Sequence, residues 1–357
     1  KLAPKCLAEE WDNVGLLVGS PEAQVNGIYV CLDVDMSILQ EAIDKGCNII
    51  LSHHPVIFKP LGQIIYDQPQ GKLLSLAIQN NLHIIAAHTN YDKAMYGVSY
   101  QLAQKLGLQN IEVLIPNNEK LYKFVVFTPH EYEEIIRKAL GDAGAGHIGN
   151  YSHCTFGAPG TGTFLPLEGT NPFIGSAGQL EKAAEVRIET IVPQNILSSV
   201  LKAVLAVHPY EEVAYDLIPL ANQNQNSGLG CLGELPRATS LSEFVLNLKE
   251  KLGVKTLKVA GDFAKSVQKI AVCGGAGKIA LTKAIASGID VLVTGELGHH
   301  DAQLAREYEV ALIDAGHFAT EYAALPYLTS FLQKQLNGSP AVPVIMAENE
   351  KDLWEFI

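Results

Sequence analysis

The sequence lacks the features that would place it in a membrane or on nucleic acid. No stretch of the 357 residues approaches eighteen consecutive apolar residues, so we expect no transmembrane helix. Lys and Arg number 26 against 38 Asp and Glu, which gives a formal net charge of −12. Because phosphate backbones are bound by dense basic surfaces and no basic run is present, we expect no general nucleic-acid binding.

The six cysteines lack the C-x-x-C spacing that is typical of thiolate metal sites and redox motifs. Cys31 and Cys273 lie in apolar runs that we interpret as strands. We therefore expect buried, reduced thiols in a cytosolic protein. Residues 1–15 contain neither an apolar signal core nor an initiator Met, and we interpret them as a truncated or partly disordered start of a cytoplasmic protein.

Two segments of the chain share one pattern. Residues 27–55 and 269–300 each begin with a short apolar strand and a loop, followed by a helix that ends at a glycine, Gly46 or Gly288. Each then runs through a second apolar strand that stops at a pair of histidines. This β-α-β rhythm is typical of a mainly parallel sheet with helices on its faces.

The likeness continues after each segment. Residues 83–92 and 310–321 both consist of a short apolar strand and then a histidine followed four residues later by an acid. The two pairs are His88 with Asp92 and His317 with Glu321. Four-residue spacing on a helix places both side chains on one face. We infer an internal duplication in which each half delivers these groups from strand C-termini, where open α/β sheets bind ligands.

The region between the halves has a different pattern. Its expected elements are a strand (122–129), a helix (130–144), hairpin-like pieces (152–164), a strand (184–192), a helix (193–207) and a last strand (213–220). This order is typical of a ferredoxin-like α+β module. The predicted fold class is α/β: a duplicated domain of residues 1–120 and 223–357 with mainly parallel sheets, interrupted by an inserted module of residues 121–222.

His53 and His54 are adjacent at the end of a predicted buried strand. Neighbouring strand residues point to opposite sides, so the two rings cannot easily chelate one ion. Where the chain turns toward Pro55, they could instead serve two different ions. The alternative is a pair of histidines that are hydrogen-bonded within a loop.

Six potential ligands gather at predicted strand ends or at the helix starts just after them: His53, His54, His88, Asp92, His317 and Glu321. A metal needs imidazoles and ionised carboxylates that converge on one point, and the duplication lets both halves meet in a shared cleft. Six groups exceed the need of one four-coordinate ion, which favours two ions ~3.5–4 Å apart with a bridging carboxylate. Imidazole and carboxylate without thiolate suit Zn, Mn, Fe or Co.

Other stretches give weaker signals. Glu296, His299 and His300 follow the duplicated strand, either as acid/base groups beside the metals or as a structural hydrogen-bonded cluster. Residues 9–15, "EEWDNVG", combine exposed acids with a Trp, and we interpret them as a structural cap over the sheet.

Two glycine-rich stretches match nucleotide-binding loops only in part. Residues 228–233 fit G-x-G-x-x-G but follow a polar linker rather than a strand, so we interpret them as flexible linker glycines. Residues 272–279 lie between a strand and a helix, and we interpret them as a tight βα turn. The alternative for this turn is a phosphate contact through its backbone N–H groups.

Four motifs together resemble a known family. "LSHHP", "AHTNYD", "TGELGHHDA" and "DAGHFATE" are similar, in this order, to the signatures of the Nif-three-like family, whose members are often labelled GTP cyclohydrolase 1 type 2 homolog. The resemblance covers nearly the whole chain, including the opening at 9–19. The insertion looks like the nitrogen-regulatory or copper-tolerance type of ferredoxin-like module found in the longer bacterial members.

The resemblance implies a dinuclear divalent-metal site. By motif position the ligands are His53 and Asp92 for one ion, His54 and His317 for the other, and Glu321 as the bridge between them. His88 would then lie just outside the ligands or face the substrate. The resemblance also implies ring-shaped homohexamers whose metal sites face an internal cavity.

We expect a metal-dependent hydrolase that acts on a small nucleotide-like or phosphorylated metabolite through a metal-activated water. Its candidate catalytic groups are His88, Glu296 and His299. The alternative is a non-catalytic metal-binding regulatory or scaffold protein, in which the inserted module senses a small-molecule effector.

Overall fold

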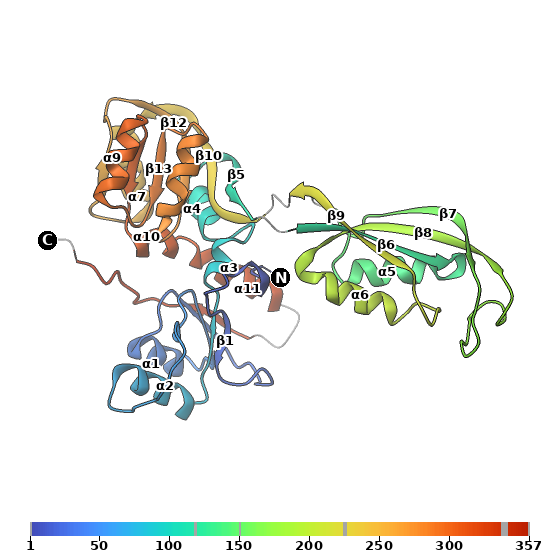
Figure 1. Cartoon of the computed structure of the whole chain (residues 1–357). Helices are drawn as coiled ribbons and strands as arrows, with labels where there is room; N and C mark the ends of the chain where they lie inside the picture. Colours follow the sequence, from blue (N-terminus) through green and yellow to red (C-terminus); the bar gives the residue numbers. More distant parts are fainter. Residues whose placement is uncertain (1, 118–119, 150, 224–226, 337–341, 356–357) are drawn as a thin grey trace. The chain divides into compact units, whose positions relative to one another are not determined.

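The computed structural model describes residues 2–117, 120–149, 151–223, 227–336 and 342–355. The chain divides into two compact units, one of residues 1–116 and 226–357 and the other of residues 117–225 (Figure 1). Within the described ranges, no helix combines the length and the apolar character that crossing a lipid bilayer requires.

The larger unit contains a five-stranded sheet in the order β1-β4-β3-β2-β15. Its strands are β1 (Gly15–Val18), β2 (Ile28–Cys31), β3 (Ile49–Ser52), β4 (His83–Ala86) and β15 (Val344–Met346). The β4, β3, β2 and β15 strands are parallel, and β1 is an antiparallel edge. Cys31, Ser52 and Ala86 are register partners. The carboxyl ends of β2, β3 and β4 therefore lie side by side at one edge.

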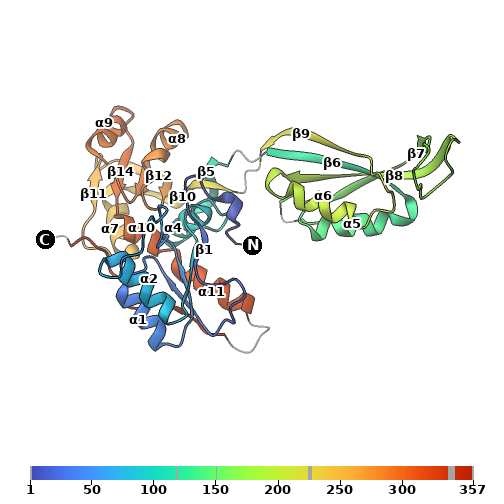
Figure 2. The same ribbon diagram turned by 60° about the horizontal axis from the view of Figure 1, so that its bottom comes forward.

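Helices cover both faces of this sheet (Figure 2). α1 (Met36–Asp44) and α2 (Pro69–Gln79) pack on one face, and α11 (Leu325–Leu336) packs on the other with η1 (Lys5–Leu7). α1 begins where Asp35 accepts a hydrogen bond from the Ile38 backbone N–H, which satisfies a free donor of the first turn. Apolar residues then fall at helical spacing on its inner face, so burial fixes the helix against the strands.

A second sheet in the same unit has six strands in the order β11-β14-β13-β12-β10-β5. They are β5 (Gln109–Pro116), β10 (Gly228–Ser240), β11 (Lys258–Ala260), β12 (Ser266–Cys273), β13 (Val291–Thr294) and β14 (Ala311–Asp314). The β12, β13 and β14 strands are parallel and repeat the order of β2, β3 and β4. β10 pairs antiparallel with both β5 and β12, and β11 pairs antiparallel with β14, so the second sheet is mixed.

Helices also enclose the second sheet. α4 (Val98–Leu106) and α7 (Leu241–Leu252) pack on one face, while η4 (Gly277–Ala280), α8 (Leu281–Ala286) and α9 (His299–Glu307) pack on the other. The central strands are buried on both sides, which explains why "VLVT" and "ALID" are continuous apolar runs rather than alternating ones. Two short helices, α3 (Thr89–Asp92) and α10 (His317–Tyr322), follow β4 and β14.

The interpretation of residues 228–233 as linker glycines is wrong. They begin β10, which is hydrogen-bonded to β5 on one side and to β12 on the other. Gly230 adopts φ +70°, and a Cβ at Gly228 would overlap with the Ile115 carbonyl oxygen. The glycines therefore permit close approach of backbones within a central strand, as glycine in a strand often does.

The unit of residues 117–225 is a four-stranded antiparallel sheet in the order β7-β8-β6-β9. Its strands are β6 (Lys120–Pro129), β7 (Thr155–Phe164), β8 (Glu181–Pro193) and β9 (Tyr215–Gln223). η2 (His130–Tyr132) and α5 (Glu133–Asp142) follow β6, and η3 (Gln194–Ile196) and α6 (Leu197–Leu205) follow β8. The two helices bury one face of the sheet around Phe124, Ile136, Ile188 and Val200.

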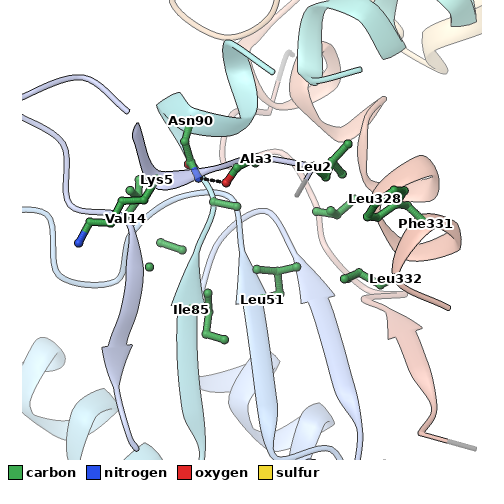
Figure 3. A pocket seen from close by; sticks show the side chains of 13 residues that line it. Leu2, Ala3, Lys5, Val14, Leu51, Ile85, Asn90, Leu328, Phe331 and Leu332 are labelled. Atoms are coloured by element: carbon green, nitrogen blue, oxygen red, sulfur yellow. Dashed lines mark hydrogen bonds between the residues drawn. The ribbon is translucent and has the colours of Figure 1, made fainter. Parts of the chain in front are cut away.

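An apolar pocket of about 270 Å³ lies on the α11 face of the first sheet (Figure 3). Leu51 and Ile85 line it from the strands, and Leu328, Phe331 and Leu332 line it from α11. The single charged lining residue is Lys5, and no lining residue is a histidine or an acid. This pocket therefore offers no acid or imidazole for chemistry.

Candidate metal centre

The end of β3 fixes the positions of His53 and His54. The backbone N–H of His53 donates to Cys31 O at 3.0 Å, and that of His54 donates to Leu32 O at 2.9 Å. The first sheet's hydrogen bonding thus continues one step past the strand. The two imidazoles emerge with ring centroids 5.1 Å apart and planes tilted by 52°.

The other groups come from the short helices after β4 and β14. Asp92 ends α3, and Glu321 lies one turn into α10, which begins at His317. The Nε2 atom of His317 is 3.1 Å from Oε1 of Glu321. The prediction that the four-residue spacing places these two side chains on one face is confirmed.

Three imidazoles converge on the Glu321 carboxylate, which is 4% exposed. Oε1 lies 3.1 Å from His317 Nε2 and 3.6 Å from His53 Nε2, and Oε2 lies 3.1 Å from His54 Nε2. His53 Nε2 is also 3.6 Å from Oδ1 of Asp92. Four side chains from both halves of the larger unit therefore meet around one buried acid.

Each of the three rings is oriented through its other nitrogen. The Nδ1 partners are Ala87 O for His53, Asp33 Oδ1 for His54 and Glu296 Oε1 for His317, each at 2.8 Å. When Nδ1–H donates to an oxygen, Nε2 is the nitrogen left for a metal, and that is the arrangement typical of metal-binding histidines. All three Nε2 atoms face Glu321.

Burial and neighbouring charges shift the pKa values of the groups in the centre. Burial opposes the charge of His54, but the carboxylates of Asp33 and Glu321 outweigh it and raise the pKa of His54 to about 10. The Glu321 carboxylate raises the pKa of His317 to about 9, against the effect of burial. Burial also disfavours an ionised Glu321, yet the surrounding imidazoles hold its pKa well below the usual value.

Three buried atoms of the centre lack a hydrogen-bond partner within the described residues: His53 Nε2, Asp92 Oδ1 and Glu321 Oε2. Burial raises the pKa of Asp92 to about 7, with His53 opposing this shift and the Glu321 charge adding to it. Unpaired buried acceptors are costly, because they give up water without gaining a partner. A divalent cation would satisfy all three, so the residues present fit a metal.

Three sets of side chains in the described part of the chain bring ligand atoms within 4.8 Å of one another. They are His53, Asp92 and Glu321; His54, His317 and Glu321; and His53, His54 and His88. The first two sets share Glu321 and draw on different strand ends. A carboxylate that belongs to two sets is suited to bridging two ions.

The three candidate catalytic residues are placed differently. His88 packs its ring against those of His53 and His54, with centroids 5.2 and 5.6 Å apart. Glu296 is 60% exposed and holds His317. His299 opens α9, where its ring contacts that of His300. The structure brings His88 and Glu296 to the centre and leaves His299 outside the three sets.

Comparison with known proteins identifies the family of the chain. The family model described as Duf34/NIF3 (NGG1p interacting factor 3) matches residues 1–352. The chain belongs to the Duf34/NIF3 family. It is 46% identical to a GTP cyclohydrolase 1 type 2 homolog of Halalkalibacterium halodurans over 88% of this chain and 85% of that protein. A homolog of the same name from Bacillus subtilis is 43% identical over 89% of this chain and 86% of that protein.

A solved structure supports the fold directly. The crystal structure of a Bacillus cereus protein related to NIF3 has a TM-score of 0.89 and 43% sequence identity, and the match covers 100% of this chain and 96% of that one. The family resemblance and the α/β fold class predicted from the sequence are therefore confirmed, although the second sheet is mixed rather than mainly parallel.

Two functional acids of this NIF3-family chain are not among the residues predicted from the sequence. Asp33, two residues beyond the end of β2, orients His54. Asp12 accepts from the His88 ring at 2.9 Å and from the Thr89 backbone N–H at 3.0 Å. The position of Asp33 could have been used to predict its role, since an acid that follows one parallel strand lies near the carboxyl end of the neighbouring strand.

The glycine turn after β12 closes over the centre. Gly275 N–H donates to Thr320 Oγ1 at 3.0 Å, and Gly277 N–H donates to Thr294 Oγ1 at 2.9 Å. These amides are already satisfied, which supports the tight-turn interpretation over the phosphate contact. Gly275 has φ +63°, and a Cβ there would overlap with Oε1 of Glu321. Glycine at this position therefore lets the backbone approach the shared carboxylate.

Proposed function

We propose that this chain is a dinuclear divalent-metal protein and acts as a hydrolase on a small nucleotide-like or phosphorylated metabolite. The observation that carries the proposal is the pair of ligand sets sharing one buried carboxylate, with unpaired acceptor atoms at their centre. The name of the curated relatives, GTP cyclohydrolase 1 type 2 homolog, supports hydrolysis of a nucleotide-like substrate.

The proposed division of ligands is the one implied by the family motifs. His53 and Asp92 would hold one ion, His54 and His317 would hold the other, and Glu321 would be shared by both. Three imidazoles and two carboxylates without a thiolate suit Zn, Mn, Fe or Co. When bound, such an ion supplies a Lewis acid that polarises substrate oxygens and lowers the pKa of coordinated water.

The chain's own residues divide the remaining tasks. Asp33 and Glu296 hold the rings of His54 and His317 in place through their Nδ1–H groups. Burial lowers the pKa of His88, so its ring is neutral near pH 7, while Asp12 holds its Nδ1–H. His88 Nε2 is then free to take a proton at the edge of the centre, which is the role we assign to it.

Turnover provides the test of catalysis. The purified protein, loaded in turn with Zn, Mn or Fe, is assayed against a panel of nucleotides and phosphoesters, with Asp92→Ala as the control. We expect turnover of at least one substrate by the wild type and a rate at least about 100-fold lower in the variant. Equal rates in both proteins for every substrate would contradict the proposed function.

Metal binding should depend steeply on pH. Because the pKa values of His54 and His317 are about 10 and about 9 in the metal-free protein, both rings carry protons at pH 7. An ion that binds both must displace these protons, so lowering the pH weakens binding and raising it strengthens binding. We expect release of about two protons per ion at the His54 site. Calorimetry at pH 7 in buffers of different ionisation enthalpy measures this number, and a value of zero would contradict the assignment.

The second candidate function is a non-catalytic metal-binding regulator or scaffold. The separate compact unit of residues 117–225 favours it, because a four-stranded sheet with two helices is an arrangement suited to an effector-sensing ferredoxin-like module. Coordination separates the two functions: an open ligand position supports catalysis, whereas saturation by protein ligands supports a structural role.

The oligomeric state and location remain those implied by the sequence. We propose a ring-shaped homohexamer in the cytoplasm, the latter supported by the buried, reduced thiols of Cys31, Cys47, Cys231 and Cys273. Light scattering on the metal-loaded protein should give six times the 38.5 kDa chain mass. A monomeric mass would contradict the hexamer.

A further inference from the structure

Three aromatic rings line the approach to the candidate metal centre. Trp11 is 61% exposed and Phe58 is 46% exposed, and their ring centroids lie 5.9 Å apart. The His88 ring lies 6.4 Å from each of them. We call Trp11, Phe58 and His88 the aromatic wall. Its inner end touches His53 and His54, and its outer end is open to solvent.

The wall is held in place from several directions. Glu9 N–H donates to Thr89 Oγ1 at 2.9 Å, and the Asp12 carboxylate accepts from the Thr89 hydroxyl and backbone N–H. Asn13 Nδ2 donates to Ile57 O at 2.6 Å, which ties the segment of Trp11 to the segment of Phe58. The two most exposed rings are therefore carried by backbone that is fixed on both sides.

Trp11 and Phe58 keep about half or more of their surface exposed, so burial accounts for only part of their placement. Large aromatic side chains stabilise a fold mainly when they are buried, and exposed ones that are held in position are typical of recognition surfaces. The polar groups of this segment are satisfied through Asp12 and Thr89 rather than through the two rings.

Two acids beside the wall are already paired. Glu9 forms an ion pair with Lys93 at 2.8 Å, and Asp12 is bound to His88 and Thr89. The wall itself consists of π faces, and stacking is tolerant of ring type because every planar ring has a π face.

We propose that Trp11 and Phe58 bind the planar heteroaromatic ring of the substrate, one by stacking on its face and the other by contact with its edge, since their own planes are 61° apart, and that His88 marks the end of the ring nearest the metals. This proposal deepens the proposed function. It rests on that function for the reaction, whereas ring binding rests on the aromatic wall alone. The substrate class it names is a purine-, pyrimidine- or pteridine-like ring compound.

Fluorescence tests ring binding directly, because the chain has two tryptophans. In a Trp354→Phe background Trp11 is the single reporter, and guanosine should quench its emission to saturation, whereas ribose should not. In the otherwise wild-type protein, equilibrium dialysis with labelled guanosine should show binding weakened about tenfold or more by Trp11→Leu or Phe58→Leu. Trp11→Tyr keeps a ring and should retain binding, and this rescue separates stacking from a loss of folding.

The matched control is Phe263→Leu, which removes a phenylalanine of similar exposure, 51%, from the loop before β12. Guanosine affinity should be unchanged there. The proposal is overturned if Trp11→Leu and Phe58→Leu bind guanosine as well as the wild type does, or if the wild type binds none of guanosine, adenosine and cytidine. It is also overturned if these variants change only the mass of the assembly, because the wall would then be an interface between copies.

Measurements of metal content and turnover distinguish a failure of ring binding from a failure of the proposed hydrolase. The Trp11→Leu variant should retain the wild-type number of ions, since none of the three ligand sets contains Trp11. Saturable, Trp11-dependent guanosine binding without turnover of any compound would sustain the inference and contradict the hydrolase. Turnover that is equal in wild type and Trp11→Leu would sustain the hydrolase and contradict the inference.

Discussion

Replacing Glu321 with Ala should remove both ions together. Its carboxylate belongs to two ligand sets, with Oε1 near His53 and His317 and Oε2 near His54. Loss of a shared ligand leaves each ion with two protein ligands at most, and we expect the affinity of both to fall at least about 100-fold. Elemental analysis after dialysis, together with calorimetric titration, measures both ions in one preparation.

Asp92→Ala is the matched comparison, because Asp92 belongs to one set alone. It should weaken mainly the ion beside His53 and leave the His54–His317 ion within about threefold of the wild type. Glu321→Gln keeps the volume of the side chain and removes its charge, so it separates lost ligation from a cavity. The bridging role would be contradicted if Glu321→Ala and Asp92→Ala lost the same single ion.

Gly275→Ala should damage the centre without replacing any of the proposed ligands. Its backbone has φ +63°, a conformation that costs an L-residue about 1–2 kcal/mol. The added Cβ would also overlap with Oε1 of Glu321 and approach His317 Nε2 to 3.3 Å. We expect the carboxylate to be displaced, with at least about tenfold weaker binding of both ions and a lower unfolding temperature.

Gly288→Ala supplies the matched control for this substitution. Gly288 follows α8 with φ +66°, and a Cβ there meets nothing within 4 Å. It should therefore lose a similar free energy of unfolding, measured by thermal or denaturant unfolding of the metal-free protein, but keep full metal affinity. Equal metal affinities in the two variants would mean that Gly275 matters for backbone strain alone.

Repetition in the sequence predicts which groups gather at the centre. The two halves present the same strand, histidine and acid spacing, so His88–Asp92 and His317–Glu321 can be aligned from the order of the residues alone. Parallel strands place their carboxyl ends at one edge, which makes convergence of these groups a physical expectation, and the structure brings them together. The resemblance to the NIF3 family implies how the proposed ligands would divide between two ions.

The supporting residues could not be found in the same way. Asp12 lies 76 residues before His88, in a loop whose path depends on tertiary packing rather than on any local pattern. The sequence marks Glu296 as a candidate acid but does not show that it binds His317. That contact crosses from the end of one strand to the end of the next. The sequence does not show the exposure of Trp11 either. The pattern around it indicates a cap over the sheet, yet Trp11 is 61% exposed.

The fold shows the same division between local and long-range information. Helix and strand rhythm predicted the parallel cores of both sheets, which β2-β3-β4 and β12-β13-β14 bear out. The glycines of residues 228–233 lie in a strand rather than in the predicted linker. A strand with a neighbour on each side can require glycine so that the backbones approach closely, and sequence alone does not show those neighbours.

The number and place of the ions test the central claim most directly. Crystals of the wild-type protein grown with Mn²⁺, measured for anomalous scattering near the manganese edge, would show each ion as a separate peak. The account predicts two peaks per chain, one beside His53 and Asp92 and one beside His54 and His317, with Glu321 contacting both. A single peak, or peaks that Glu321 does not contact, would contradict it.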